Sequence, residues 1–412
     1  MIRFATNGQS RRLFQMPLRN LIVLITCQLI SATGAIVMVT LGGIIGASLA
    51  ENQALATLPV SIMIVAVAAT TVPATMLMHR IGRKFGFILS SLSAVCAVVL
   101  ASFALAHESF TLFIVAGGMF GINMAFTQQY RYAAAESVET RYAPRAISLV
   151  LAGAIGGAIV GPELVKYGQY WIEDVQYAGA LLSVAVLYAV QALLLLLLGP
   201  LRGEDAATHA MPQRPLRQIV TQPVYIVAVL GGAIAYGVMT LIMTATPLSM
   251  HINDGYSIEQ TAQVIRSHVL GMYVPSLVSG WLMERLGTIR MMSIGAVALL
   301  LACLIALQGQ SVMHYWYALV LLGVGWNFLY VGGTTALTLT YSMAERFKAQ
   351  AVNEFAVFGT SATTSLLAGT VIYFYGWTTV VILPLPLLAI ILVSLYLVRR
   401  DTLIRRLAPG TG

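Results

Sequence analysis

The chain has 412 residues, of which 58% are hydrophobic and only 9% carry a charge. A soluble domain has about 25% charged residues, so this composition excludes a chain of two or three soluble domains and indicates an integral membrane protein with many spans. The net charge of +8 does not indicate nucleic-acid binding, because the sequence has no basic run with interleaved aromatic residues.

Apolar segments long enough to cross a bilayer, which takes about 20 residues, recur along the whole chain. The first is far longer than a signal-peptide core of roughly 7–15 residues, so we expect an uncleaved first helix. The expected spans, about twelve in number, are 20–45, 56–78, 84–106, 109–133, 144–167, 177–199, 222–248, 264–283, 289–309, 315–341, 350–374 and 377–398. The hydrophilic stretch 200–221 predicts a cytoplasmic linker between an N-terminal bundle, 1–199, and a C-terminal bundle with its tail, 222–412.

The basic residues predict the orientation of the chain, because short loops rich in Lys and Arg stay in the cytoplasm. With both termini inside, 21 of the 23 Lys and Arg residues lie on the cytoplasmic side, and only Lys166 and Arg266 lie outside. We therefore expect a multi-pass protein of the cytoplasmic (inner) membrane, embedded in the lipid bilayer, with both termini in the cytoplasm.

The two halves of the sequence resemble each other at an offset close to half the length. The matching pairs are 80–82 with 285–287, 121–123 with 325–327, and 145–146 with 348–349. A parallel duplication of six helices is the arrangement in which a substrate site lies near the membrane midplane, and the two halves rock around it.

The loop after the second span reads TMLMHRIGRK over 75–84, and its copy in the second half reads GWLMERLG over 280–287. These stretches resemble the G-x-x-x-D-R-x-G-R-R/K motif of the major facilitator superfamily, and the resemblance covers the whole chain. It implies an all-α membrane fold of twelve helices in two pseudo-symmetric six-helix bundles.

The family's loop motif implies a cytoplasmic latch between charged side chains. In the first copy Thr75 and His79 replace the Gly and Asp of the motif, so a latch there depends on Arg83 with Glu136. The residues assigned to this motif are Arg80, Gly82, Arg83, Glu136, Glu284, Arg285 and Gly287. The alternative is that these charges only keep the loops in the cytoplasm.

The fifth span contains Gly157-x-x-x-Gly161-Pro162, which is similar to a family motif often seen in exchangers that expel solutes against protons. Small residues four apart also let two helices pack closely, and Pro can kink a helix. Both interpretations stay open. The family's usual arginine in the fourth helix is missing, since Val115 and Ala116 stand there.

Three stretches look like a little-characterised bacterial branch of the superfamily, some members of which are thought to take up riboflavin. They are QYRYAAAE at 129–136, GWNF at 325–328 and NEFAVFG at 353–359.

Helices 1, 4, 7 and 10 line the cavity in the superfamily, so polar residues on the corresponding spans are candidates for substrate contact. They are Gln28, Thr33, Asn123, Gln128, Arg131, Tyr236, Thr240, Trp326, Asn327 and Tyr330. Trp326 and Tyr330 share a helix face and can stack, which suits a flat, hydrogen-bonding ligand. The alternative is helix–helix packing through interhelical hydrogen bonds.

Ionisable residues inside spans are costly and are therefore candidates for proton coupling or for a gate. Arg131, Glu163 and Glu354 fall in this class, and Arg131 with Glu354 would form an inner gate. The alternatives are an Arg131 side chain that extends to the cytoplasmic face, a Glu354 that favours a helix N-terminus, and a Glu163–Lys166 ion pair. We expect His268, at the start of span 8, to lie at the membrane interface.

Together these patterns predict a secondary active transporter that moves a small organic solute by alternating access, coupled to protons. Riboflavin-type vitamin uptake is the first candidate, and proton-driven efflux of drugs or metabolites is the alternative. A channel and a membrane-embedded enzyme are further alternatives, although the sequence lacks H-E-x-x-H, G-x-S-x-G and P-loop motifs. We expect a monomer without enzyme activity, cofactor or metal.

Overall fold

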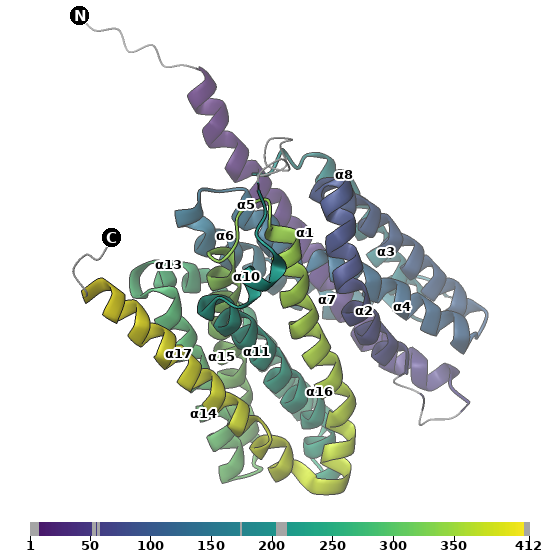
Figure 1. The fold of residues 1–412 in the computed structure, drawn as a ribbon. Coiled ribbons are helices and arrows are strands. Elements are labelled where there is room, and N and C mark those ends of the chain that lie inside the picture. Colours follow the sequence, from purple (N-terminus) through teal and green to yellow (C-terminus); the bar gives the residue numbers. More distant parts are fainter. Residues whose placement is uncertain (1–7, 52–54, 56–57, 174, 203–211, 408–412) are drawn as a thin grey trace, which may run out of the picture. The chain divides into compact units, whose positions relative to one another are not determined.

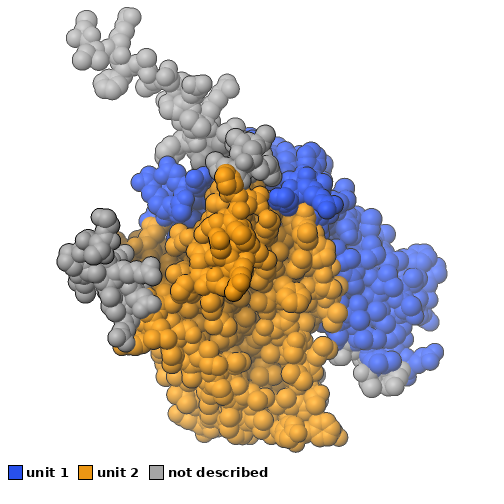
Figure 2. Space-filling view, viewed as in Figure 1, with its two compact units in different colours: residues 1–63, 77–210 blue, residues 64–76, 211–412 orange. Residues whose placement is uncertain are grey.

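The computed structural model describes residues 8–51, 55, 58–173, 175–202 and 212–407 (Figure 1). Within these ranges the chain is helical and contains no strand. Part of the expected linker, 203–211, lies outside the described residues, as do the side chains of the basic residues at both ends of the chain. The helices form two compact units (Figure 2), of which unit 1 comprises 1–63 and 77–210 and unit 2 comprises 64–76 and 211–412.

In unit 1, α1 packs against α7 and α8, and α3 packs against α4 and α8. Its helices are α1 (Gly8–Leu49), both ends of α2 (Leu58–Ile81), α3 (Arg83–Ala106), α4 (Phe110–Thr127), α5 (Tyr130–Glu136), α6 (Ala143–Ala152), α7 (Ala154–Gly168) and α8 (Ala178–Leu196). The expected fourth span is therefore two helices, α4 and α5, and the fifth span is interrupted between α6 and α7 at Gly153.

Unit 2 has α15 at its centre, packed against α11, α12 and α14, while α16 packs on α11 (Figure 1). Its helices are α10 (Leu216–Val220), α11 (Pro223–Pro247), α12 (Ile258–Tyr273), α13 (Ser276–Leu286), α14 (Thr288–Gln308), α15 (Val312–Thr338), α16 (Arg346–Ile382) and α17 (Pro384–Leu407), together with the middle of α2. The short helix α10 lies inside the segment expected to be linker.

Ten helical segments of the described chain are long and apolar enough to cross a membrane. The difference from twelve has two local causes. Pro275 separates α12 from α13, so that neither piece reaches spanning length, because proline cannot donate the backbone hydrogen bond that would continue a helix. Residues 346–399 form one apolar run in which Gly376 (φ 75°) marks the bend between the eleventh and twelfth expected spans. The architecture is consistent with the twelve-helix fold.

The internal repeat is visible in the geometry of two loops. Gly82 has φ 83° and ψ 156° before α3, and Gly287 has φ 86° and ψ 147° before α14. Glycine tolerates such positive φ values without a steric penalty, whereas other residues do not. Each unit therefore makes the same turn at the same point of its sequence.

The fifth-span glycines lie in a close contact between α1 and α7. A Cβ atom added to Gly157 would lie 2.7 Å from the backbone nitrogen of Thr33, and one added to Gly161 would lie 2.8 Å from a methyl carbon of Ile36. These glycines let the two helix backbones approach each other, which is the packing role that small residues four apart commonly have.

A buried polar hub joins four helices of unit 1. Gln191 on α8 accepts a hydrogen bond from Ser31 on α1 (3.1 Å) and donates to Ser91 on α3 (2.9 Å) and to Tyr130 on α5 (3.0 Å). Gln191, Ser91 and Tyr130 have no exposed surface. Interhelical hydrogen bonds of this kind contribute about 0.6–2 kcal/mol each in a membrane protein.

The α1–α7 contact predicts opposite effects for two Gly→Ala substitutions. Gly157→Ala should lower the unfolding free energy by about 1–3 kcal/mol, because the methyl group has no room. At Gly369 on α16 an added Cβ atom has no neighbour within 4 Å. Gly369→Ala should therefore raise the unfolding free energy by up to about 1 kcal/mol, because alanine has the higher helix propensity. Thermal unfolding in detergent measures both, and an increase in Tm for Gly157→Ala would contradict the close contact.

Candidate functional site

Five aromatic side chains gather in unit 2, and we call them the aromatic cluster: Tyr236 of α11, Tyr273 of α12, Trp326 and Tyr330 of α15, and Phe358 of α16. The Tyr236 ring lies 5.3 Å from Trp326, 4.9 Å from Tyr330 and 5.2 Å from Phe358, measured between centroids. Trp326 and Tyr330 stack at 4.9 Å with 26° between their planes, as their spacing predicts.

The side chains of the aromatic cluster differ in burial. Trp326 and Tyr330 are each only 1% exposed, whereas Tyr236 is half-buried. The indole nitrogen of Trp326 is buried and has no hydrogen-bond partner among the described residues. A buried N–H group without a partner costs roughly 1–3 kcal/mol, so this donor is available to a ligand atom.

Two polar pairs lie on the same helices as the cluster. Thr240, one turn after Tyr236, shares a hydrogen bond of 2.9 Å with Ser361 of α16. On α16 the Asn353 amide donates to Glu354 at 2.9 Å, and both side chains are buried. The helix α16 therefore carries hydroxyl, amide and carboxylate groups on either side of Phe358.

Three of the expected cavity residues form hydrogen bonds within the protein, and two of them, Asn123 and Asn327, hold helices together. Asn123 donates to the backbone oxygen and the hydroxyl of Ser90 on α3, both at 2.9 Å. Asn327 donates to the backbone oxygen of Met272 (2.8 Å) and to the Ser276 hydroxyl. Thr33 donates to Leu29 within α1. These contacts are the packing role that the sequence leaves open as the alternative.

The other expected cavity residues of unit 1 lie in two places, Gln128 and Arg131 at the start of α5 and Gln28 on α1. The Arg131 side chain, 1% exposed, donates to the backbone oxygen of Gln128 (2.8 Å) and to its amide oxygen (3.3 Å), and its guanidinium lies over the Tyr132 ring. Arg131 is thus buried rather than extended to solvent. Gln28 is half-buried, with its Cβ next to Gly153.

The remaining ionisable candidates differ in burial. Glu354 is fully buried, while Glu163 is exposed. The expected Glu163–Lys166 ion pair does not form between these two described residues, and Lys166 instead lies 5.0 Å from the centre of the Tyr167 ring. His268, expected at the membrane interface, is completely buried within the protein, with Nδ1 2.8 Å from the backbone oxygen of Leu319.

Comparison with known proteins identifies the family. The model of the Major Facilitator Superfamily matches residues 21–326 and 230–412. The chain belongs to this superfamily. It is therefore a multi-pass membrane protein and a secondary transporter of small molecules, not an enzyme.

Relatives in the superfamily match along most of the chain. The riboflavin transporter RfnT of Brucella anthropi is 37% identical over 92% of this chain and 95% of its own length. The uncharacterised transporter YdeG of Bacillus subtilis is 28% identical, with 86% of each chain covered. The resemblance to a bacterial branch that includes riboflavin transporters is thus confirmed.

Solved structures of the superfamily share the fold. The transporter FucP in its outward conformation has a TM-score of 0.72 at 15% identity, covering 92% of this chain and 98% of its own. The human organic anion transporter MFSD10 has a TM-score of 0.75 at 13% identity, covering 92% and 99%. At these identities the likeness concerns the fold alone.

The superfamily loop motif forms a buried ion pair in unit 1. Arg83 donates from Nε and Nη2 to the two carboxylate oxygens of Glu136, both at 2.7 Å, and from Nη1 to Gln129 at 3.2 Å. The Arg83 side chain is 0% exposed and that of Glu136 is 5% exposed. The other charged motif residues, Arg80, Glu284 and Arg285, are exposed, and Arg285 lies over the Trp281 ring.

Breaking this pair should be far more costly than breaking an exposed one. Glu136→Gln leaves the buried Arg83 charge uncompensated and should lower the unfolding free energy by about 3–5 kcal/mol. Glu139→Gln is the matched control, because the Glu139–Arg141 pair is 3.0 Å long and about 70% exposed, and its loss should cost about 0–1 kcal/mol. Equal destabilisation of the two variants in detergent unfolding would contradict the structural role of the buried pair.

Proposed function

We propose that this transporter carries riboflavin into the cell. The observation that carries the proposal is the 37% identity, over nearly the full length of both chains, to a protein named as a riboflavin transporter. The aromatic cluster supports it independently, because it offers stacked and edge-on rings next to a buried donor.

The chemistry of riboflavin fits this cluster. Its ring system is flat and aromatic, and aromatic pairs contribute about 0.5–1.5 kcal/mol beyond the area they bury. One edge of the ring carries carbonyl and ring-nitrogen acceptors, which suit the Trp326 N–H group and the Thr240 and Ser361 hydroxyls. Riboflavin is neutral, and the five side chains of the cluster carry no charge.

The cellular arrangement is part of the same proposal. The basic residues of the sequence support an inner-membrane protein with cytoplasmic termini, and the duplicated sequence supports two bundles, 1–199 and 222–412, joined by the linker 200–221. We propose that it works as a monomer by alternating access.

The cluster predicts which side chains determine riboflavin affinity. Tyr236→Ala should weaken riboflavin binding by about tenfold, or 1.4 kcal/mol, because three ring contacts are lost. Tyr317→Ala is the control, since Tyr317 is on the same unit, is 53% exposed and contacts Trp316. Quenching of flavin fluorescence by the purified protein measures the Kd.

Two outcomes would contradict this proposal. If the wild-type protein does not bind riboflavin but is stabilised by lipophilic cations, the alternative of drug efflux replaces it. If Tyr236→Ala and Tyr317→Ala have the same Kd as the wild type, riboflavin binds elsewhere in the chain.

We further propose that transport is coupled to protons through Glu354, because a fully buried carboxylate in a membrane protein can exchange a proton during the transport cycle. Arg131 and Glu354 as an inner gate remain a prediction of the sequence.

Proton coupling predicts a specific response to pH. An inward proton gradient across proteoliposomes should raise the initial rate of riboflavin entry. A gradient of one pH unit, worth about 1.4 kcal/mol per proton, should allow up to about tenfold accumulation of riboflavin at steady state. Glu354→Gln should abolish this acceleration and leave riboflavin exchange without a gradient intact, whereas Glu163→Gln, at an exposed site, should behave as the wild type. A wild-type rate that does not respond to the gradient would indicate uniport instead.

A further inference from the structure

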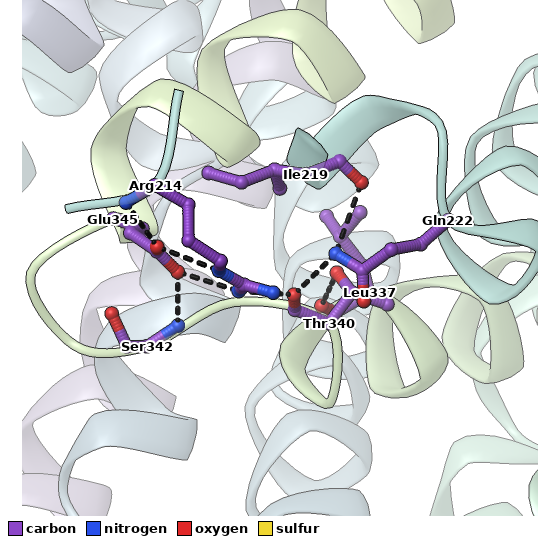
Figure 3. Close-up of polar contacts among 7 residues, drawn as sticks. All are labelled: Arg214, Ile219, Gln222, Leu337, Thr340, Ser342 and Glu345. Atoms are coloured by element: carbon purple, nitrogen blue, oxygen red, sulfur yellow. Dashed lines mark hydrogen bonds and ion pairs between the residues drawn. The ribbon is translucent and has the colours of Figure 1, made fainter. Parts of the chain in front are cut away.

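The segment that leads into unit 2 is attached to α16 before it enters α11. The backbone nitrogen and Nε of Arg214 donate to Oε1 of Glu345, both at 2.8 Å, and Nη2 donates to Oε2 at 2.7 Å (Figure 3). The backbone nitrogen of Ser342 donates to the same carboxylate at 2.9 Å. We call the Arg214–Glu345 pair the clamp.

Further hydrogen bonds extend the clamp on both sides. Arg214 Nη2 and the Gln222 amide both donate to the backbone oxygen of Thr340, at 3.0 and 2.9 Å (Figure 3). The ammonium group of Lys348 donates to Gln213 at 2.7 Å. Residues 213–222 are therefore bonded both to the loop after α15 and to the first turn of α16.

The clamp differs from a surface ion pair because its carboxylate is buried. The Glu345 side chain is only 1% exposed, whereas that of Arg214 is 42% exposed. The hydrogen bonds from Arg214 hold the pKa of the Glu345 carboxyl well below its usual range. Removing the Arg214 side chain would leave a buried carboxylate held by two backbone N–H groups, those of residue 214 and Ser342, without a charged partner, which is strongly unfavourable.

A continuous helix connects the clamp to the candidate site. Glu345 immediately precedes α16, and Phe358 lies about 20 Å further along it at 1.5 Å per residue. The one non-helical residue inside α16 is Gly376, well beyond Phe358 and Ser361. The Tyr225 hydroxyl donates to Ala349 at 2.8 Å and holds the same first turns against α11.

We propose that Arg214 is a positioning residue for transport, which holds the connecting segment on the first turn of α16 and thereby sets where α16 presents Phe358 and Ser361. This inference rests on the proposed riboflavin site. By chain order alone, a displacement of residue 214 would reach α11 first. Because Arg214 is bonded to Glu345, the same displacement would also move the start of α16.

The test is a double-mutant cycle on riboflavin affinity. Arg214→Ala and Phe358→Ala should each weaken binding by about fivefold. The double variant should lose much less affinity than the roughly 25-fold that additivity predicts, because the Phe358 contact can be lost only once and the displacement of Ser361 alone adds to it. Arg214→Lys should lie between Arg214→Ala and the wild type, since a lysine cannot make the bidentate contact. Arg217→Ala is the control, because Arg217 lies in the same segment, is exposed and has no side-chain bond to Glu345.

Hydrogen exchange gives a second readout that needs no ligand. Exchange of the backbone amides in 349–361 should be faster in Arg214→Ala than in Arg217→Ala or the wild type. The positioning role is overturned if exchange increases only at 212–222 and 340–348, or if Arg214→Ala weakens binding equally with and without Phe358. If the wild type does not bind riboflavin, the proposed function fails while the exchange experiment still decides whether the clamp acts on α16.

Discussion

Polar groups that leave water must find partners within the protein, and this constraint explains where most of the buried polar side chains of both units lie. The cost of an unpaired group is highest for charges, and accordingly the buried Arg83 is held by two bonds to Glu136. Buried neutral groups also find partners, although an unpaired one costs less free energy than a charge. An example is the hub that Gln191 forms with α1, α3 and α5. The indole nitrogen of Trp326 is one of several buried polar atoms that have no partner among the described residues, and it is the donor on which the proposed riboflavin site relies.

The two halves share the conformation of a turn but differ in the contacts of their buried side chains. Gly82 and Gly287 make the same turn, and Asn123 and Asn327 occupy equivalent positions on α4 and α15. However, Asn123 bonds to α3, whereas Asn327 bonds to α12 and α13. The position equivalent to Trp326 is Ile122, so the stacked aromatic pair is a feature of one half only. The two halves therefore share these turns, while the aromatic residues of the proposed binding site occur in the second half alone.

Periodicity predicts which residues share a helix face, and this is why the Trp326–Tyr330 stack follows from the sequence. It does not predict which helix lies opposite, so the interhelical hydrogen bonds of Asn123 and Asn327 became visible only in the structure. Phe358 escaped notice because an apolar residue in an apolar span gives no signal. The clamp joins residues 131 positions apart in segments without periodicity, which no local pattern reveals. The spans themselves follow from composition, but the break at Pro275 and the continuous apolar run through Gly376 changed their apparent number.

The absence of charge from the five rings of the aromatic cluster has an electrical consequence. A neutral cargo bound by neutral side chains moves no net charge when the site changes the side of the membrane to which it is open. Each elementary charge that does cross is worth about 2.3 kcal/mol per 100 mV of membrane potential. In the proposed riboflavin–proton cycle, the voltage sensitivity would then come from the coupled protons and from ionisable groups such as Glu354. The net charge that crosses the membrane per riboflavin molecule would equal the number of coupled protons.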